Sequence, residues 1–230
     1  LVALEGMDDR LPAQLSGGQQ QRVAVARALA HRPEVLLMDE PFGALDAKIR
    51  EELRRTIRQI QRELDMTTIL VTHDQEEAFA LADRIGVMHQ GRLLECGKPD
   101  DLYTRPATRF VSTFLGAANL LLGYRTARGV RFSSTPMAGG EVPREVVAIL
   151  RPEEVELCAD ELAIKSNFVS HGQVEEVLFG GAVERLRVRM ASDGPVPVAP
   201  GREGSTGQGS LLEVSRTLPE QRDFPVAVGQ

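Results

Sequence analysis

Two apolar runs separated by an amphipathic segment constrain the fold of this chain most. The continuous run Val-Leu-Leu-Met at 35–38 is typical of a strand buried on both faces of a parallel sheet. The run at 67–72 is a second strand of the same kind. Between them, apolar residues recur every three or four positions over 45–64, which indicates a long helix with one buried face. Strands that alternate with helices predict an α/β domain.

Shorter patterns complete the expected first domain. A helix is predicted over 16–31, because Ser16 and Gln19 have the spacing of a capping box. A short helix is expected over 75–82. The segment 85–95 predicts two strands that turn at its central Gln-Gly pair.

The pattern changes in the second half of the chain. Short apolar alternations, separated by Gly and Pro, predict small β-strands in a sandwich or barrel over 119–230. We therefore expect an α/β domain over 1–118, with the boundary between residues 116 and 122. Many Gly, Pro and Ser residues over 192–209 predict a loop or a flexible stretch.

Composition disfavours several kinds of partner and site. The 27 Lys and Arg residues against 33 Asp and Glu residues give a net charge of −6, which disfavours nucleic acid as a partner. Cys96 and Cys158 lie far apart and lack the spacing of a metal site, so we expect reduced thiols. No apolar run approaches the length that crosses a bilayer, and any membrane role is expected to be peripheral.

The start of the first predicted helix has features of an anion site. A helix N-terminus presents unpaired N–H groups and partial positive charge. Gly17 and Gly18 would let this backbone come close to a ligand, and the Ser16 hydroxyl could donate to it. A plain capping box of Ser16 and Gln19 explains the same residues, and the short motif alone favours that simpler interpretation.

Acidic and imidazole side chains follow the two predicted strands. Ligands of parallel sheets lie beyond the carboxyl ends of the strands, where Asp39 could hold Mg²⁺ and Glu40 could take a proton from water. A pair of loop acids that cap a helix is the alternative. His73 ends the second strand at the same edge and could reach the same ligand. Asp46 is well placed as the N-cap of the long helix.

These pieces occur together in one order, and in that order they resemble the ATP-binding subunits of ABC transporters. The resemblance extends without a gap from about residue 11 to residue 122. Its four motifs are the signature LSGGQ at 15–19, the Walker B strand VLLMDEP at 35–41, the D-loop GALD at 43–46 and the switch histidine in VTHD at 71–74.

The resemblance implies a P-loop NTPase-type parallel sheet core, an ATPase activity, and ATP and Mg²⁺ as cofactors. It assigns Asp39 to Mg²⁺, Glu40 to the attacking water, His73 to the γ-phosphate and Asp46 to a contact across a dimer. In this family two ATPase subunits pair head to tail. Each signature helix then covers the ATP of the other subunit.

Head-to-tail pairing would explain why the N-terminus of the predicted helix over 16–31 has features of an anion site. It implies that the backbone and side chains at the start of the signature helix face a nucleotide held by the partner; these residues are Ser16, Gly17, Gly18 and Gln19.

The segment 97–121 is similar to a narrower group of importers, whose ATPases carry a C-terminal regulatory β-domain of the OB-like, TOBE type. Its members serve the uptake of polyamines, maltose, sulfate, ferric iron and phosphonate. The resemblance implies transmembrane permease subunits as partners, an external solute-binding protein acting indirectly, and a peripheral location at the cytoplasmic face of the membrane. It does not specify the solute, and it implies no nucleic acid partner.

The sequence departs from the family in one respect. It contains no G-x-x-x-x-G-K-[ST] motif, because the single Gly-Lys pair at 97–98 is followed by Pro. We expect the Walker A loop, the adenine-stacking aromatic and the Q-loop glutamine to lie before Leu1, which leaves the core incomplete. The chain is thus expected to be an ATPase by family and inactive alone.

Two alternatives remain open at this point. An ATPase of the same family that acts in DNA repair or translation has the same signature, although the segment 97–121 and the acidic charge favour transport. The chain could instead be a regulatory binding fragment, whose β-rich tail binds a small ligand or an inhibitory partner.

Overall fold

The computed structural model describes most of the chain, in two compact units, Leu1–Thr104 and Arg105–Gln230. The described residues are 4–43, 45–126, 129–132, 144–159, 168–191, 194 and 211–230. The predicted flexible stretch 192–209 therefore lies, apart from position 194, outside the described residues.

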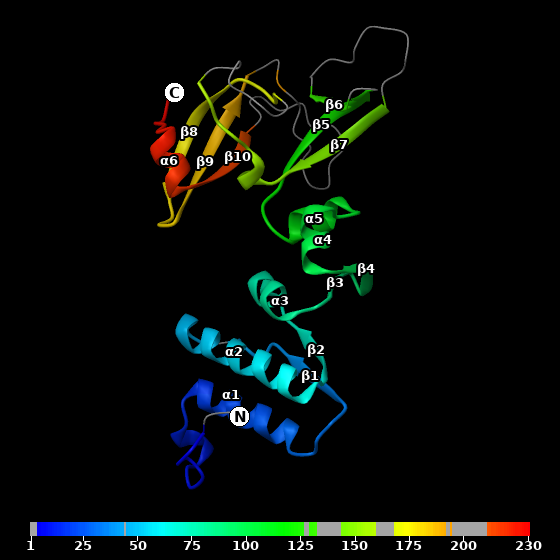
Figure 1. Ribbon diagram of the computed structural model, residues 1–230, viewed down its shortest axis with the longest axis vertical. Coiled ribbons are helices and arrows are strands. Elements are labelled where there is room, and N and C mark those ends of the chain that lie inside the picture. Colours follow the sequence, from blue (N-terminus) through cyan, green and yellow to red (C-terminus); the bar gives the residue numbers. More distant parts are fainter. Residues whose placement is uncertain are drawn as a thin grey trace. The chain divides into compact units, whose positions relative to one another are not determined.

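The first unit alternates helices and strands (Figure 1). Its elements are η1 (Pro12–Gln14), α1 (Gly17–Leu29), β1 (Val35–Asp39), α2 (Ala47–Leu64), β2 (Thr67–Val71), α3 (Gln75–Leu81), β3 (Ile85–His89), β4 (Arg92–Gly97) and α4 (Pro99–Thr104). The strands β1 and β2 pair in parallel, in a register that aligns Val35 with Thr67 and Asp39 with Val71. The predicted order of parallel strand, helix and parallel strand is confirmed.

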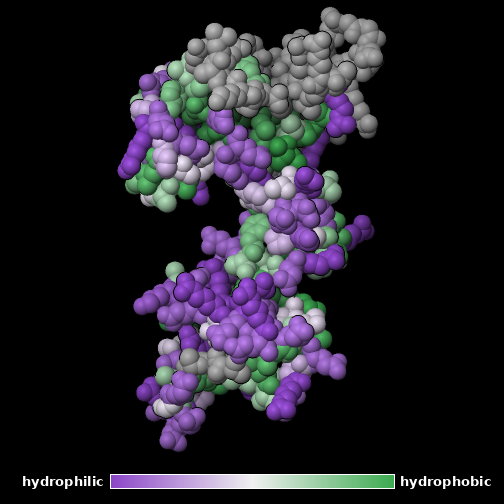
Figure 2. Space-filling model, viewed as in Figure 1, coloured by the Kyte–Doolittle hydropathy of each residue, from purple (hydrophilic) through white to green (hydrophobic). Residues whose placement is uncertain are grey.

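The core of this unit lies between β1 and the apolar side of α2. Leu36 and Met38 of β1 are buried with Leu53 and Ile57 of α2, and Phe42 from the loop after β1 and Leu81 of α3 complete the cluster. The outer side of α2 is charged, and Figure 2 shows a hydrophilic surface over this helix. The amphipathic pattern over 45–64 is confirmed, since apolar residues three or four positions apart face one core.

The prediction that β1 and β2 are buried on both faces is wrong. Along β1 the residues alternate between exposed and buried, and Leu37 is 70% exposed. Ile69 and Val71 of β2 are exposed in the same way. Within the described residues each strand has the other as its strand neighbour, and the helix α2 covers one face of β1. The opposite face therefore presents apolar side chains without a layer over them in the part of the chain described.

The strands β3 and β4 form the predicted hairpin as a separate two-stranded sheet. Gln90 and Gly91 turn the chain, with φ angles of 47° and 74°. Two successive positive φ angles are typical of the type I′ turn that matches the twist of paired strands. The position of this turn is confirmed.

The second unit is rich in antiparallel strands. Its elements are α5 (Arg109–Phe114), β5 (Asn119–Thr126), β6 (Gly129–Phe132), β7 (Arg144–Leu150), η2 (Pro152–Glu154), β8 (Gly172–Phe179), β9 (Val183–Met190), β10 (Leu211–Thr217) and α6 (Leu218–Asp223). They form one sheet in the order β6-β5-β7 and another in the order β10-β9-β8. Short β-strands after the first domain are confirmed, and the OB-like topology stays a prediction.

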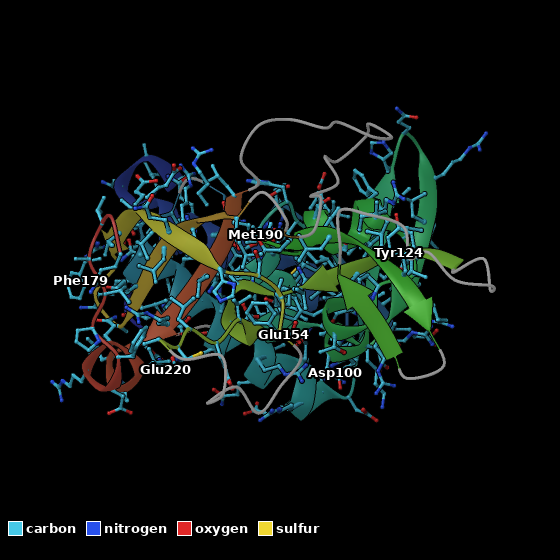
Figure 3. All side chains as sticks on the ribbon, turned by 90° about the horizontal axis from the view of Figure 1, so that it is seen from above. Asp100, Tyr124, Glu154, Phe179, Met190 and Glu220 are labelled. Carbon is cyan, nitrogen blue, oxygen red and sulfur yellow. The ribbon has the colours of Figure 1, made fainter. Side chains whose placement is uncertain are left out.

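Alternate residues of the second sheet form the core of this unit. Leu186 and Val188 of β9 pack with Leu212 and Val214 of β10, and Leu121 of β5 joins the same cluster. This two-residue period is what a half-buried strand requires. Phe179, the last residue of β8, is exposed and is labelled in Figure 3.

A buried arginine connects α5 to the β-rich unit. The guanidinium of Arg151 donates hydrogen bonds to the carbonyl oxygens of Ser112 at 2.8 Å and Ala117 at 3.0 Å, near the end of α5. A cation at a helix C-terminus is favoured by the helix dipole and by the unpaired carbonyl groups there. The compact unit therefore includes α5, while the domain boundary after residue 118 stays a prediction.

Candidate functional site

The ends of β1 and β2 bring two predicted motifs to one sheet edge. The register places Asp39 beside Val71, and the backbone N–H of Glu40 donates to the Val71 carbonyl oxygen at 2.9 Å. Because parallel strands end on the same side, the residues that follow both strands emerge together. This edge is where ligands of parallel sheets bind.

Glu40 and His73 meet at this edge. Nδ1 of His73 lies 2.7 Å from Oε1 of Glu40, a hydrogen-bond distance. The pKa of His73 is raised, first by this hydrogen bond and then by the negative charge of Glu40, with smaller contributions from Glu77 and Asp74. The imidazole is 84% exposed, so its one close partner largely defines its environment. The carboxylate therefore favours the imidazolium form of His73.

The backbone of Glu40 adopts a conformation that side chains rarely accept. Its φ angle is 47°, in the left-handed region, and its carbonyl oxygen accepts from the N–H of Gly43 at 3.2 Å. For a residue with a Cβ this conformation costs about 1–2 kcal/mol. Such strain often occurs where a structure must hold a functional group in place. Here it turns the chain sharply at the end of β1 and leaves the carboxylate beside His73.

Asp39 is the last residue of β1 and is exposed. Within the described residues, no three His, Cys, Asp or Glu side chains gather closely enough to hold a metal ion. Mg²⁺ needs no such cage, since it commonly binds one or two carboxylates, water and the phosphate oxygens of a substrate. A single exposed carboxylate at this edge fits that mode of binding.

The start of α1 is closed by the predicted capping box, which is confirmed. The Ser16 hydroxyl accepts from the N–H of Gln19 at 3.3 Å, and the Gln19 side chain accepts from the N–H of Ser16 at 2.9 Å. The amide of Gln20 donates to the carbonyl oxygens of Pro12 and Leu15, which fixes η1 to the helix. Ser16 keeps its hydroxyl proton for another acceptor, because it only accepts in the box.

The two glycines of α1 differ in their surroundings. Gly17 is exposed, and a Cβ there would lie 3.7 Å from Leu45. Gly18 is buried, and a Cβ there would lie 2.4 Å from Cγ2 of Ile49 in α2. Gly18 is thus explained by close packing of α1 on α2, a reason that the sequence did not reveal. Its predicted approach to a ligand stays a prediction.

Asp46 caps α2 as predicted, since its carboxylate accepts from the N–H of Ile49 at 3.0 Å. The neighbouring Ala44 of the GALD motif lies outside the described residues. The predicted contact of Asp46 across a dimer stays a prediction.

The structure thus gathers part of the predicted site. Glu40 and His73 are in contact, and Asp39 precedes them at the same edge. The residues from Ser16 to Gln19 begin a different element, α1, which packs against α2. The direct pairing of Glu40 with His73 was missed from the sequence, although their positions after two neighbouring parallel strands were a signal for it.

Comparison with known proteins identifies relatives over most of the chain. Residues 1–43 match the family model of the ABC transporter. The sulfate/thiosulfate import ATP-binding protein CysA 2 of Shewanella oneidensis is 47% identical over 200 residues, which cover 84% of this chain and 54% of the relative. The spermidine/putrescine import ATP-binding protein PotA of Oleidesulfovibrio alaskensis is 43% identical over 88% of this chain and 57% of its own length.

Two further matches are a curated relative and a solved structure. The sulfate/thiosulfate import ATP-binding protein CysA 1 of Chromobacterium violaceum is 40% identical over 100% of this chain and 60% of its own length. A solved dimeric ATP-binding cassette, in a post-hydrolysis state with ADP and Pi, is 40% identical over 41% of this chain and 40% of that chain, with a TM-score of 0.37. The chain spans between 54% and 60% of the length of these curated relatives. Its homologues are ATP-binding subunits of ABC-type import systems, which confirms the resemblance found in the motifs.

Proposed function

We propose that this chain contributes the sheet edge at which ATP is hydrolysed in an ATPase that energises solute import. The observation that supports it best is the 2.7 Å pairing of Glu40 with His73 at the ends of two parallel strands. The names of the homologues support the same activity, since CysA 2, PotA and CysA 1 are all import ATP-binding proteins.

Glu40 is the proposed proton acceptor. One of its carboxylate oxygens pairs with His73, which leaves the other oxygen for an attacking water molecule. The strained backbone of Glu40 holds this oxygen at the strand end, so little reorganisation is needed when water binds.

His73 is the proposed contact to the transferred phosphate. Its Nδ1 is engaged with Glu40, which leaves Nε2 to donate to a γ-phosphate oxygen. The raised pKa of His73 favours the imidazolium, whose positive charge suits the negative charge of the phosphoryl group. Asp39 would hold Mg²⁺, which neutralises phosphate charge when it is bound.

These 230 residues contain no P-loop motif. The groups that bind the phosphates of ATP in the proposed ATPase therefore have to be supplied by a segment that carries this motif. In the proposed head-to-tail dimer, the start of α1 covers the ATP of the partner. The free hydroxyl proton of Ser16 and the exposed backbone of Gly17 are available for that contact. Asp46, beside Leu45 before α2, would lie at the dimer contact.

The wider partners follow from the same proposal. An import ATPase works with transmembrane permease subunits, and indirectly with an external solute-binding protein, at the cytoplasmic face of the membrane. None of the helices in the described residues is long and apolar enough to span a membrane. The relatives named above import sulfate, thiosulfate, spermidine or putrescine, and these anions and polyamines are the first solutes to examine. The β-rich unit is the proposed regulatory domain of OB-like, TOBE type.

A chimera tests the proposed activity. A segment that contains a P-loop motif is fused ahead of Leu1. Glu40→Gln in this chimera should reduce ATP hydrolysis by about 10²–10⁴-fold and leave ATP binding intact, because only the proton acceptor is lost. Glu34→Gln, an exposed position before β1, is the matched control. Hydrolysis by Glu40→Gln at the rate of the control would refute the proposed role.

A further inference from the structure

A buried carboxylate beneath His73 takes no part in the chemistry proposed above. The side chain of Glu77, in α3, is 4% exposed. Its Oε2 accepts from the Thr72 hydroxyl at 2.5 Å, and its Oε1 lies 3.8 Å from Nη2 of Arg54 and 4.0 Å from Nε of Arg50. A buried charge is tolerated only where partners compensate for lost water. Glu77 has three such partners, two of them from α2.

Asp74 is tied to the same helix. One carboxylate oxygen caps α3 by accepting from the N–H groups of Glu76 at 2.9 Å and Glu77 at 3.3 Å. The other oxygen lies 3.3 Å from Nη1 of Arg50 and 3.8 Å from Nη2 of Arg54. The start of α3 is therefore fixed to α2, its neighbour in Figure 1.

Thr72 closes the cluster around the histidine. Its hydroxyl accepts from the N–H of Asp74 at 3.0 Å while it donates to Glu77. The backbone on both sides of His73 is thus held, by Thr72 before it and by Asp74 after it. The exposed imidazole has few packing neighbours that could orient it, so the restraint on its backbone has to do so.

We propose that Thr72, Asp74 and Glu77, together with Arg50 and Arg54, form a positioning cluster that holds His73 against Glu40. That the cluster contributes to catalysis rests on the proposed function, whereas the contacts within the cluster do not depend on it. In some proteins, buried ion pairs contribute specificity of structure more than stability. We expect this one to fix a single position of the imidazole.

Thr72→Val tests the cluster without changing any charge. It removes the hydroxyl that bridges Glu77 and the Asp74 backbone, and Thr72→Ser restores it. The readout is the pKa of His73 by NMR in the full chain, assigned among the four histidines with His73→Gln. We expect Thr72→Val to lower this pKa toward the ordinary value of about 6.5, because the contact with Glu40 loosens, and Thr72→Ser to keep it.

Thr56→Val is the matched control, since the Thr56 hydroxyl donates to a carbonyl within α2 and not to this cluster. It should leave the pKa of His73 unchanged. A folded Thr72→Val protein with the pKa of the wild type would overturn the proposal. Folding is checked by far-UV circular dichroism.

Arg54→Gln decides the question if Thr72→Val fails to fold. Removing the positive charge of Arg54 should by itself raise the pKa of the imidazole. The negative charges of Glu40, Asp74 and Glu77, which favour the imidazolium, are then less compensated. Loss of positioning should lower it. A lowered pKa supports the cluster, and a raised or unchanged pKa overturns it.

The catalytic assignment is tested separately in the P-loop chimera. If His73→Gln hydrolyses ATP at the wild-type rate there, the proposed function of His73 fails while the NMR result on the cluster stands. If Thr72→Val lowers both the pKa and the rate, and Thr72→Ser lowers neither, positioning and chemistry are connected.

Discussion

Gly18 is the residue at which packing makes the sharpest prediction. A Cβ at this position would lie 2.4 Å from Cγ2 of Ile49, a distance that real Cβ atoms essentially never show. Gly18→Ala therefore pushes α1 away from α2 or forces Ile49 from its rotamer. Overpacking of this kind costs about 1–3 kcal/mol.

Gly17→Ala is the matched control, because its Cβ would meet Leu45 at an ordinary 3.7 Å. Both substitutions gain the same helix propensity, at most about 1 kcal/mol, so this gain cancels in their difference. We expect the Gly18→Ala protein to have a free energy of unfolding about 1–3 kcal/mol below that of Gly17→Ala. Urea unfolding followed by far-UV circular dichroism measures the difference, since the long helices lie in this unit.

A second substitution tests the cause. Ile49→Leu moves the branch away from Cβ and so removes the atom that clashes. In the Gly18→Ala background it should recover stability, with a coupling energy of about 0.5–3 kcal/mol in the double-mutant cycle. Equal stability of the two alanine variants, with no coupling to Ile49, would refute the packing explanation.

Three further predictions concern the other predicted residues. Asp46→Ala should lower the free energy of unfolding by about 0.5–2 kcal/mol in urea, because the N–H of Ile49 loses its acceptor, and Asp46→Asn should lose less. Since Glu40 raises the pKa of His73, the stability from this pair should be complete below the ordinary pKa of about 6.5 and be lost as pH rises through the folded-state pKa. Urea midpoints of wild type and His73→Gln on both sides of neutrality check this. In the P-loop chimera with Glu40→Gln, Ser16→Arg should prevent an ATP-dependent dimer in gel filtration while ATP still binds. A capping role alone predicts that the dimer survives, with a loss of about 0.5–2 kcal/mol in stability.

The elements of the first unit were predictable because each has a local cause. Ser16 and Gln19 satisfy one helix end by themselves, and the Gln90-Gly91 pair adopts the turn that a hairpin needs. The exposure of Leu37 was not predictable in this way. An apolar run shows that a strand can be covered on both faces, but the layers that cover it come from elsewhere.

Contacts between residues far apart in the sequence were a second feature that could not be predicted. The pattern over 45–64 predicted one buried, apolar face for α2, yet the charged side chain of Arg54 is also only 13% exposed and lies 3.8 Å from Glu77. The two are separated by more than twenty positions along the chain, and spacing gives no sign of the contact. For the same reason, the motif at His73 indicated a function without showing that Glu40 would be its partner.

One helix connects the parts of the molecule that the proposed function assigns to two different nucleotides. Ile49, in the first turn of α2, receives the close approach of Gly18, so the signature helix rests on it. Arg50, the next residue, donates to the carbonyl oxygen of Leu45 at 3.1 Å and pairs with Asp74, beside the histidine. In a head-to-tail dimer the start of α1 would face the ATP of the partner, whereas the sheet edge would face the ATP of its own subunit. The beginning of α2 therefore sets the distance between the start of α1 and the sheet edge at His73. For this reason the cap of α2, its packing against Gly18 and its two arginines have to be tested together.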